Sequence, residues 1–332
     1  MSALINQEAR SRVLTSLRHA MGEHIIAALA DPTVVEVMVN PDGKIWIDKV
    51  GHHGTIWTGE RLDPQAAERI LRALATHAGI TVTKDQPRVS ATLPETGERF
   101  QGAIPPVVEA PMFAIRKRPE MIFRLDGEPS SYVEKGIMTP AQAMLIRRAV
   151  IDRENIVVVG GTGSGKTTFL NAILAEPAFK EDRVIIIEDT KELQCSADDC
   201  VQLLTKPGDN PILMSDLVRD VLRLRPDRIV GGEVRDGLTA LNLLKAWNTG
   251  HPGGCTSIHA NSALEALSRF EELIAECTAH LPKRAIGQAI NVVVFIERTE
   301  KGRRIKDVIR VRGYNTQTEQ YELEDLQETM AA

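Results

Sequence analysis

A glycine-rich run that ends in a lysine and a threonine is the part of this sequence best suited to chemistry. Residues 160–167 read GGTGSGKT and follow the pattern G-x-x-x-x-G-K-[ST]. Glycines allow the backbone to fold around phosphate oxygens and to point its N–H groups inward. In this pattern Lys166 supplies a positive charge for the β- and γ-phosphates, and Thr167 supplies a hydroxyl for Mg²⁺. The run therefore predicts a loop that binds ATP together with Mg²⁺.

The segments on either side of this run provide the setting that such a loop requires. NIVVV, residues 155–159, is typical of a buried strand, and TTFLNAIL, residues 167–174, is typical of a helix. The N-terminus of a helix favours a bound anion through its dipole and its unpaired N–H groups. The residues expected to contact the nucleotide are Gly161, Thr162, Gly163, Ser164, Gly165, Lys166, Thr167 and Thr168.

Acidic residues follow two other apolar runs. RVIIIED ends in Glu188 and Asp189, and RIVGGE ends in Glu233. In parallel α/β sheets the chemistry lies at the carboxyl ends of the strands. A carboxylate placed there either helps to hold Mg²⁺ or takes a proton from the attacking water, although such an acid can also merely cap the next helix. Glu188 and Glu233 are the two candidates for the catalytic base, and Thr167 and Glu233 are the candidates for holding the metal.

One histidine and two arginines are further candidates for catalysis. His259 stands at the end of a predicted strand in TGHPGGCTSIHANS, where an imidazole can sense the γ-phosphate or bond the acid that activates water. Arg116 in FAIRKR and Arg99 in GERFQ are cations of the kind that stabilise charge on a transferred phosphoryl group. The alternative is a structural histidine and two solvated surface arginines.

The periodicity of the first 118 residues differs from that of the rest. Helical spacing is followed by short alternating runs, which predicts a small N-terminal α+β domain over residues 1–118. The expected helices cover 1–30 and 64 to about 77, and the expected strands lie within 34–58, 88–93, 98–104 and 111–117. Residues 119–136 are polar and rich in turn-forming residues, which predicts a linker.

From residue 137 onward, apolar β-branched runs alternate with helical patterns. Helices are expected near 140–151, 166–175, 215–224, 237–247 and 262–278, with strands between them. Such an alternation is typical of a parallel sheet that is covered on both faces. The fold class predicted for residues 137–332 is therefore α/β, a P-loop (RecA-like) domain with a parallel-rich sheet.

The overall composition narrows the class of protein. The net charge is -5 and aromatic residues make up 4%, so there is no strong signal for nucleic-acid binding. The four cysteines form no C-x-x-C pair, which argues against a zinc ribbon. No apolar stretch reaches the length of a spanning helix, and the first residues lack the apolar core of a signal peptide. We expect a cytoplasmic protein, or one peripheral to the cytoplasmic face of the inner membrane.

Taken together, four boxes in this chain resemble those of the secretion ATPases of the type II/type IV superfamily. They read, in order, GGTGSGKTT (Walker A), IIIEDTKELQ (Asp box), LRLRPDRIVGGEVRD (Walker B) and TGHPGGCTSIHANS (His box). The resemblance covers about residues 20–310. The Walker B box is most similar to the conjugation and type IV secretion branch. The type II secretion and pilus ATPases usually carry a longer N-terminal region, often with a tetracysteine zinc site.

The resemblance implies a hexameric ring at the cytoplasmic face of the inner membrane, with nucleotide between the N- and C-terminal domains. It also implies that Arg99 and Arg116 reach the γ-phosphate. The chain departs from many such ATPases at Gly232, where they have a second acid. The choice of catalytic base between Glu188 and Glu233 therefore stays open.

The function expected from these features is ATP hydrolysis that powers assembly or substrate transfer by a conjugative type IV secretion system. The expected partners are further copies of the chain and inner-membrane components of the apparatus. Three alternatives compete with this hypothesis: a type II secretion or pilus motor, a nucleotide-gated scaffold with negligible turnover, and a nucleic-acid translocase. The low aromatic content and the acidic charge argue against the third.

Overall fold

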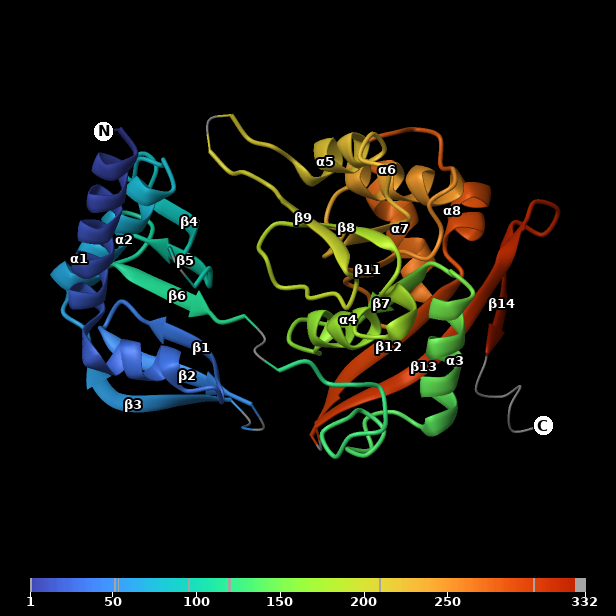
Figure 1. Cartoon of the computed structure of the whole chain (residues 1–332), viewed down its shortest axis with the longest axis horizontal. Coiled ribbons are helices and arrows are strands. Elements are labelled where there is room, and N and C mark those ends of the chain that lie inside the picture. The colour runs from blue at the N-terminus through green and yellow to red at the C-terminus, as the bar shows by residue number, and fades with distance from the viewer. Residues whose placement is uncertain are drawn as a thin grey trace. The chain divides into compact units, whose positions relative to one another are not determined.

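The computed structural model describes residues 2–50, 52, 54–94, 96–118, 121–208, 210–300 and 302–325, with side chains from residue 15 to residue 324. The chain divides into two compact units (Figure 1): Met1–Glu120 with Pro207–Asp209, and Met121–Lys206 with Asn210–Ala332. In the described part of the chain, no helix combines the length and the apolar character that crossing a membrane demands.

The first unit is a six-stranded sheet with two helices. Its strands follow the order β3-β2-β1-β6-β5-β4, and every neighbouring pair is antiparallel. The helices are α1 (Ser2–Ala30), which departs from helical geometry at Gly22, and α2 (Pro64–His77). The strands are β1 (Val34–Val39), β2 (Lys44–Lys49), β3 (Thr55–Arg61), β4 (Arg88–Thr92), β5 (Arg99–Ala103) and β6 (Met112–Arg116).

Local sequence explains where α2 lies. Asp63 caps the helix by accepting a hydrogen bond from the backbone N–H of Ala66, and Pro64 occupies the first helical position, where it fits without strain. Ile70 and Leu74 of α2 are buried in one cluster with Phe100 and Phe113 of the sheet. This core holds β5 and β6 side by side, with their outer side chains in a regular row.

The second unit contains two groups of strands. In one, β10 (Arg228–Gly231), β8 (Arg183–Glu188) and β9 (Asp199–Leu204) are parallel to one another. In the other, β11 (Cys255–Ile258), β7 (Ile156–Val159) and β12 (Val292–Thr299) are parallel, and β13 (Gly302–Asn315) and β14 (Gln320–Asp325) extend them as antiparallel strands. β10 lies against β11, so the two groups are neighbours.

Helices cover both faces of these strands, as expected from the uninterrupted apolar runs. Val157 and Val159 of β7 pack in one core, and Ile156 and Val158 pack in another, because successive side chains point to opposite faces. The first core includes α5 (Met214–Val221), α6 (Gly237–Asn248), α7 (Glu265–Ala275) and α8 (Lys283–Ala289), which gather on one side in Figure 1. The second includes α3 (Pro140–Ile151) and α4 (Lys166–Leu174), while the short 3-10 turn η1 (Pro177–Phe179) adds Phe179.

Residues 121–136, expected to form most of the linker, lie in the second unit. Leu125 and Tyr132 are buried there, and the ring of Tyr132 meets that of Phe169 edge-on at 5.0 Å between centroids. The polar composition of the segment conceals these few apolar anchors. Residues 119 and 120 of the expected linker lie outside the described residues.

The structure also contains elements that the sequence patterns did not predict, namely β9, α8, β13 and β14, with β3 as a separate strand. The antiparallel pair β13 and β14 lies beyond the last strand that the sequence pattern predicted for the parallel-rich sheet. The physical reason is that charged residues interrupt the apolar residues of β13, which therefore lacks the continuous apolar run of a buried strand.

Candidate active site

The glycine-rich loop connects the end of β7 to the start of α4. Gly163 and Gly165 have φ values of +71° and +100°, a left-handed conformation that favours glycine. Gly165 stands directly before α4 and has no side chain with which to cap the helix. The N–H groups of the first helical turn are therefore suited to an anion such as phosphate.

Lys166 is folded back over this loop. Its ammonium group donates hydrogen bonds to the carbonyl oxygens of Gly160 and Gly161, at 3.0 and 3.2 Å. The same Nζ lies 3.1 Å from Nδ1 of His259 and 3.8 Å from Oε1 of Glu233. The side chain is only 7% exposed, so its charge is held at one place beside the loop. A phosphate oxygen in the loop can replace the two carbonyl oxygens as acceptor of the lysine's hydrogen bonds with little movement of the lysine.

Glu233 stands after β10, beyond Gly231 and Gly232. Its carboxylate accepts a hydrogen bond from Nε of Arg235 at 2.6 Å, and its Oε1 lies 3.0 Å from Nε2 of His259. Burial, the largest single influence, raises the pKa of Glu233, but the charge and hydrogen bond of Arg235, with further contributions from His259 and Lys166, leave the pKa below its ordinary value. Glu233 is therefore an ionised carboxylate, as a proton acceptor or metal ligand must be.

The contacts of His259 define its protonation state. Lys166 can only donate, so Nδ1 must accept from it, and Nε2 must then carry the hydrogen that is donated to Glu233. Burial lowers the pKa of His259, and the nearby charges of Lys166 and Arg235 lower it further, against the opposing effect of Glu233. At neutral pH the ring is neutral and links the lysine to the carboxylate.

We expect an NMR titration of His259 to give a pKa below the ordinary value of about 6.5. Lys166→Ala should raise that pKa, because it removes a neighbouring cation, and Glu233→Gln should lower it, because it removes the opposing anion. The lowered pKa also affects stability. As the pH falls, His259 is protonated in the unfolded chain before it is protonated in the folded chain, so the free energy of unfolding decreases as the pH falls through about 6.5. A pKa that neither substitution moves would contradict the three-residue contact.

Glu188 ends β8 and is placed differently. Its Oε1 accepts hydrogen bonds from the backbone N–H groups of Glu192 and Leu193, at 3.0 and 2.9 Å. β8 and β10 pair in parallel, which brings Glu188 beside Gly232: a Cβ at Gly232 would lie 3.1 Å from Cγ of Glu188. A larger residue at position 232 would thus press on Glu188. The two acids that end neighbouring strands have distinct surroundings, and Glu188 also shapes the backbone that follows it.

Arg235 joins the acidic residues of the two strand ends. Its guanidinium contacts Glu233, and its other side lies 2.9 Å from Oδ2 of Asp189. Nothing in the sequence pattern singled out Arg235 from the other arginines around it. Its spacing two residues after Glu233 is the only local signal, since the contact with Asp189 spans 46 residues.

Arg99 and Arg116 lie together in the first unit. They are directly opposite each other on β5 and β6, and Glu36 of β1 is opposite Arg116 on the other side. All three line a hollow of about 270 Å³ with Gln101 and Ala114. Burial raises the pKa of Glu36, although Arg116 and Arg99 oppose that rise. The sheet register thus pairs the two predicted arginines and adds an acid that the sequence did not reveal.

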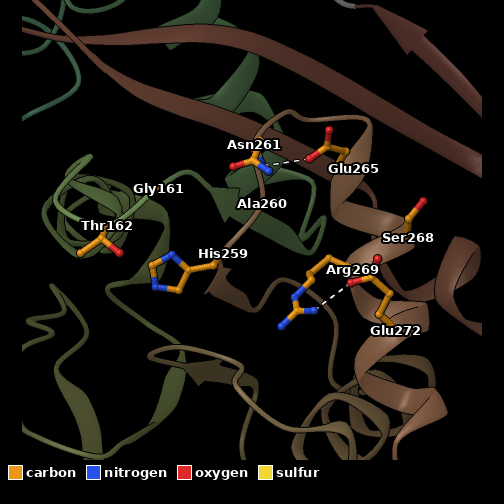
Figure 2. A pocket seen from close by; sticks show the side chains of 9 residues that line it. All are labelled: Gly161, Thr162, His259, Ala260, Asn261, Glu265, Ser268, Arg269 and Glu272. Atoms are coloured by element: carbon orange, nitrogen blue, oxygen red, sulfur yellow. Dashed lines mark hydrogen bonds and ion pairs between the residues drawn. The ribbon is translucent and has the colours of Figure 1, made fainter.

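A cavity of about 530 Å³ opens beside the glycine-rich loop of the second unit. Figure 2 shows the ring of His259 next to Thr162 of the loop, with Arg269 reaching in from α7. Arg269 is paired with Glu272 at 2.8 Å. The remaining lining residues are Gly161, Ala260, Asn261, Glu265 and Ser268. Its size is within the range of small-molecule sites.

The oxygen donors near the loop suit Mg²⁺. Thr167 carries a hydroxyl in the first turn of α4, and Glu233 and Asp189 are carboxylates after β10 and β8. Hydroxyl and carboxylate oxygens are the hard ligands that Mg²⁺ prefers, and it usually keeps waters and takes further oxygens from the phosphates of a substrate. The chemistry of these donors therefore fits the predicted metal, and the choice of Thr167 and Glu233 as its ligands stays a prediction.

Comparison with known proteins identifies the family. The sequence profile described as "Type II/IV secretion system protein" matches residues 19–310. The chain belongs to this family. It is 47% identical over 315 residues to the conjugal transfer protein TrbB of Rhizobium radiobacter, covering 93% of this chain and 94% of that one. It is 31% identical to the type IV secretion system protein VirB11 of Bartonella henselae, covering 82% and 83% of the two chains.

A solved structure of the pilus retraction motor PilT with bound ADP has a similar fold. It aligns with a TM-score of 0.60 and 17% identity over 92% of this chain and 87% of that one. At this identity the likeness concerns the fold alone. The family and the TrbB relatives confirm the resemblance inferred from the four boxes.

Proposed function

We propose that this chain is an ATPase that powers assembly or substrate transfer by a conjugative type IV secretion system. The observation that carries the proposal is the contact of Lys166, Glu233 and His259 beside a loop of sequence G-x-x-x-x-G-K-[ST]. Membership of the type II/IV secretion family and the likeness to TrbB and VirB11 support the cellular setting.

In the proposed mechanism, residues 161–168 hold the phosphates of ATP through backbone N–H groups and Lys166. Thr167 and Glu233 would hold Mg²⁺, which would supply positive charge beside the phosphates. Glu233 accepts a proton from the attacking water, and His259 keeps its carboxylate in place through the Nε2 hydrogen bond. Glu188 is the other candidate for the base, and His259 would then act as a sensor of the γ-phosphate.

The finer fold assignment belongs to the same proposal: residues 137–332 form a P-loop, RecA-like domain. Its support is the loop at the carboxyl end of β7, flanked in the sheet by β11 and β12, with acids at the ends of β8 and β10. In open α/β sheets ligands bind at this edge. We further propose that six copies form a ring, peripheral to the cytoplasmic face of the inner membrane and bound to membrane components of the apparatus.

A phosphate-release assay with purified chain and ATP·Mg²⁺ tests the enzymatic part of the proposal. Steady release that needs Mg²⁺ and saturates with ATP is expected. Tight ATP binding with negligible release, in the presence and absence of membrane partners, would instead favour a nucleotide-gated scaffold.

Arg116→Ala is expected to weaken ATP-dependent assembly and turnover while ADP affinity changes by less than about twofold. The reason is that we assign Arg99 and Arg116 to the γ-phosphate, which ADP lacks. Light scattering with a non-hydrolysable ATP analogue measures assembly, and calorimetry measures ADP affinity. Gln101→Ala, in the same hollow, serves as the control because it removes no charge. An equal loss of ADP and ATP affinity would refute the γ-phosphate role, and a monomeric wild type with nucleotide at tens of micromolar would refute the ring.

A further inference from the structure

Two arginines face each other across the hairpin that joins β12 to β13. Arg298 and Arg303 are direct partners in the antiparallel register, and Thr299 and Gly302 pair at the turn. Like charges that stand directly opposite each other on a sheet repel and are destabilising. In the described part of the chain, neither guanidinium has an ion pair or a hydrogen bond that would offset this repulsion, and both side chains are exposed.

The same hairpin approaches the glycine-rich loop. A Cβ at Gly165 would lie 2.9 Å from Cδ and 3.0 Å from Nε of Arg303. A Cβ at Gly163 would lie 3.9 Å from a terminal nitrogen of Arg298. β12 pairs with β7 up to the contact of Phe295 with Val159, so the end of β12 runs alongside the start of the loop. Both cations are therefore within a side chain's reach of the place where the loop holds phosphate.

The order of the strands places these two arginines on one flank of the glycine-rich loop. β7 lies between β11 and β12. His259 follows β11, and Lys166 and Glu233 contact it there. Arg298 and Arg303 stand on the β12 flank, which is away from the residues assigned to the γ-phosphate. An anion bound on that flank belongs to the part of the nucleotide that ADP and ATP share.

We propose that Arg298 and Arg303 bind the α- and β-phosphates of the nucleotide and so form a second cationic arm of the site. This inference rests on the proposed function of the loop. Guanidinium groups donate charge-assisted hydrogen bonds to phosphate oxygens in a planar geometry that lysine does not reproduce. A phosphate between the two arginines offsets their mutual repulsion. The arm adds to Lys166 and makes no contact with the atoms that react.

The test compares the double variant R298Q/R303Q with R304Q by calorimetry. Arg304 is also exposed, but its register partner is Glu297 and its side chain points to the other face of the hairpin. The control therefore removes a positive charge from the same hairpin without removing one of the two arginines that face the loop. We expect the double variant to lose roughly tenfold in affinity for ADP and for a non-hydrolysable ATP analogue alike. The R304Q variant should stay within about twofold of wild type. R298K/R303K, which keeps both charges, should recover only part of the loss.

The outcomes separate this inference from the proposed function. Wild-type binding that disappears in Lys166→Ala but is unchanged in R298Q/R303Q would overturn the cationic arm and leave the nucleotide loop standing. A loss of affinity for the ATP analogue alone would also overturn it, because the arm is assigned to the shared phosphates. A change in assembly without a change in affinity would assign the arginines to a contact between copies. Thermal melting without nucleotide confirms that the variants fold.

Discussion

Lys166→Ala is expected to reduce ATP turnover about a thousandfold, which corresponds to about 4 kcal/mol in the activation free energy. The lysine is the cation held over the loop by the carbonyl oxygens of Gly160 and Gly161. Without it, charge that develops on the β- and γ-phosphates has no compensating partner at that position. Steady-state phosphate release measures the effect, and a thermal melt shows whether the fold is retained.

Lys180→Ala is the matched control for this prediction. Lys180 is exposed just after η1, and its removal also changes the net charge by one. Its turnover should equal that of wild type. Turnover of Lys166→Ala within about twofold of wild type, a change of roughly 0.4 kcal/mol, would refute the assignment of the nucleotide loop.

Glu233→Gln is expected to lower turnover by a factor on the order of 10² to 10³ while nucleotide affinity is nearly retained. Glutamine has the shape of glutamate and can still accept the hydrogen bond from His259, but it cannot take a proton from water. The positive charges of Lys166, Arg235 and the loop are unchanged. Single-turnover phosphate release and calorimetry with an ATP analogue measure the two quantities separately.

The comparison with Glu188→Gln decides which acid is the base. Glu188 accepts two backbone hydrogen bonds, so its replacement should also loosen residues 192 and 193. Glu181→Gln, exposed near the opposite end of β8, serves as the control. Normal turnover in Glu233→Gln together with lost turnover in Glu188→Gln would make Glu188 the base. Lost nucleotide affinity in a folded Glu233→Gln would show that Glu233 chiefly serves the metal.

The parts of the fold that depend on local sequence could be predicted well. Helix α3 occupies the expected residues 140–151, because Thr139 and Gln142 form a reciprocal cap at its start and Pro140 fits its first turn. The loop between β7 and α4 is where the glycines and the flanking apolar run indicate. The ends of β8 and β10 carry the acids expected of them.

The parts that depend on register between distant segments could not be predicted. Glu36 joins the two arginines of the first unit only because β1, β6 and β5 are neighbours in the sheet. Arg298 and Arg303 reach the loop only because β12 pairs with β7. In a sequence, exposed charged residues on strands cannot be told from ordinary surface residues, since the segments they contact lie far along the chain.

The most direct measurement of the central claim is conjugative plasmid transfer from donor cells in which this chain is replaced by its Glu233→Gln variant. We expect this variant to bind nucleotide without hydrolysing it. Its effect on transfer therefore shows whether transfer requires ATP hydrolysis or only the presence of the nucleotide-bound protein. We predict that transfer falls to the level of donors lacking the gene, while the Glu181→Gln control transfers like wild type. Full transfer by Glu233→Gln, with phosphate release from the purified variant shown to be lost, would contradict the account.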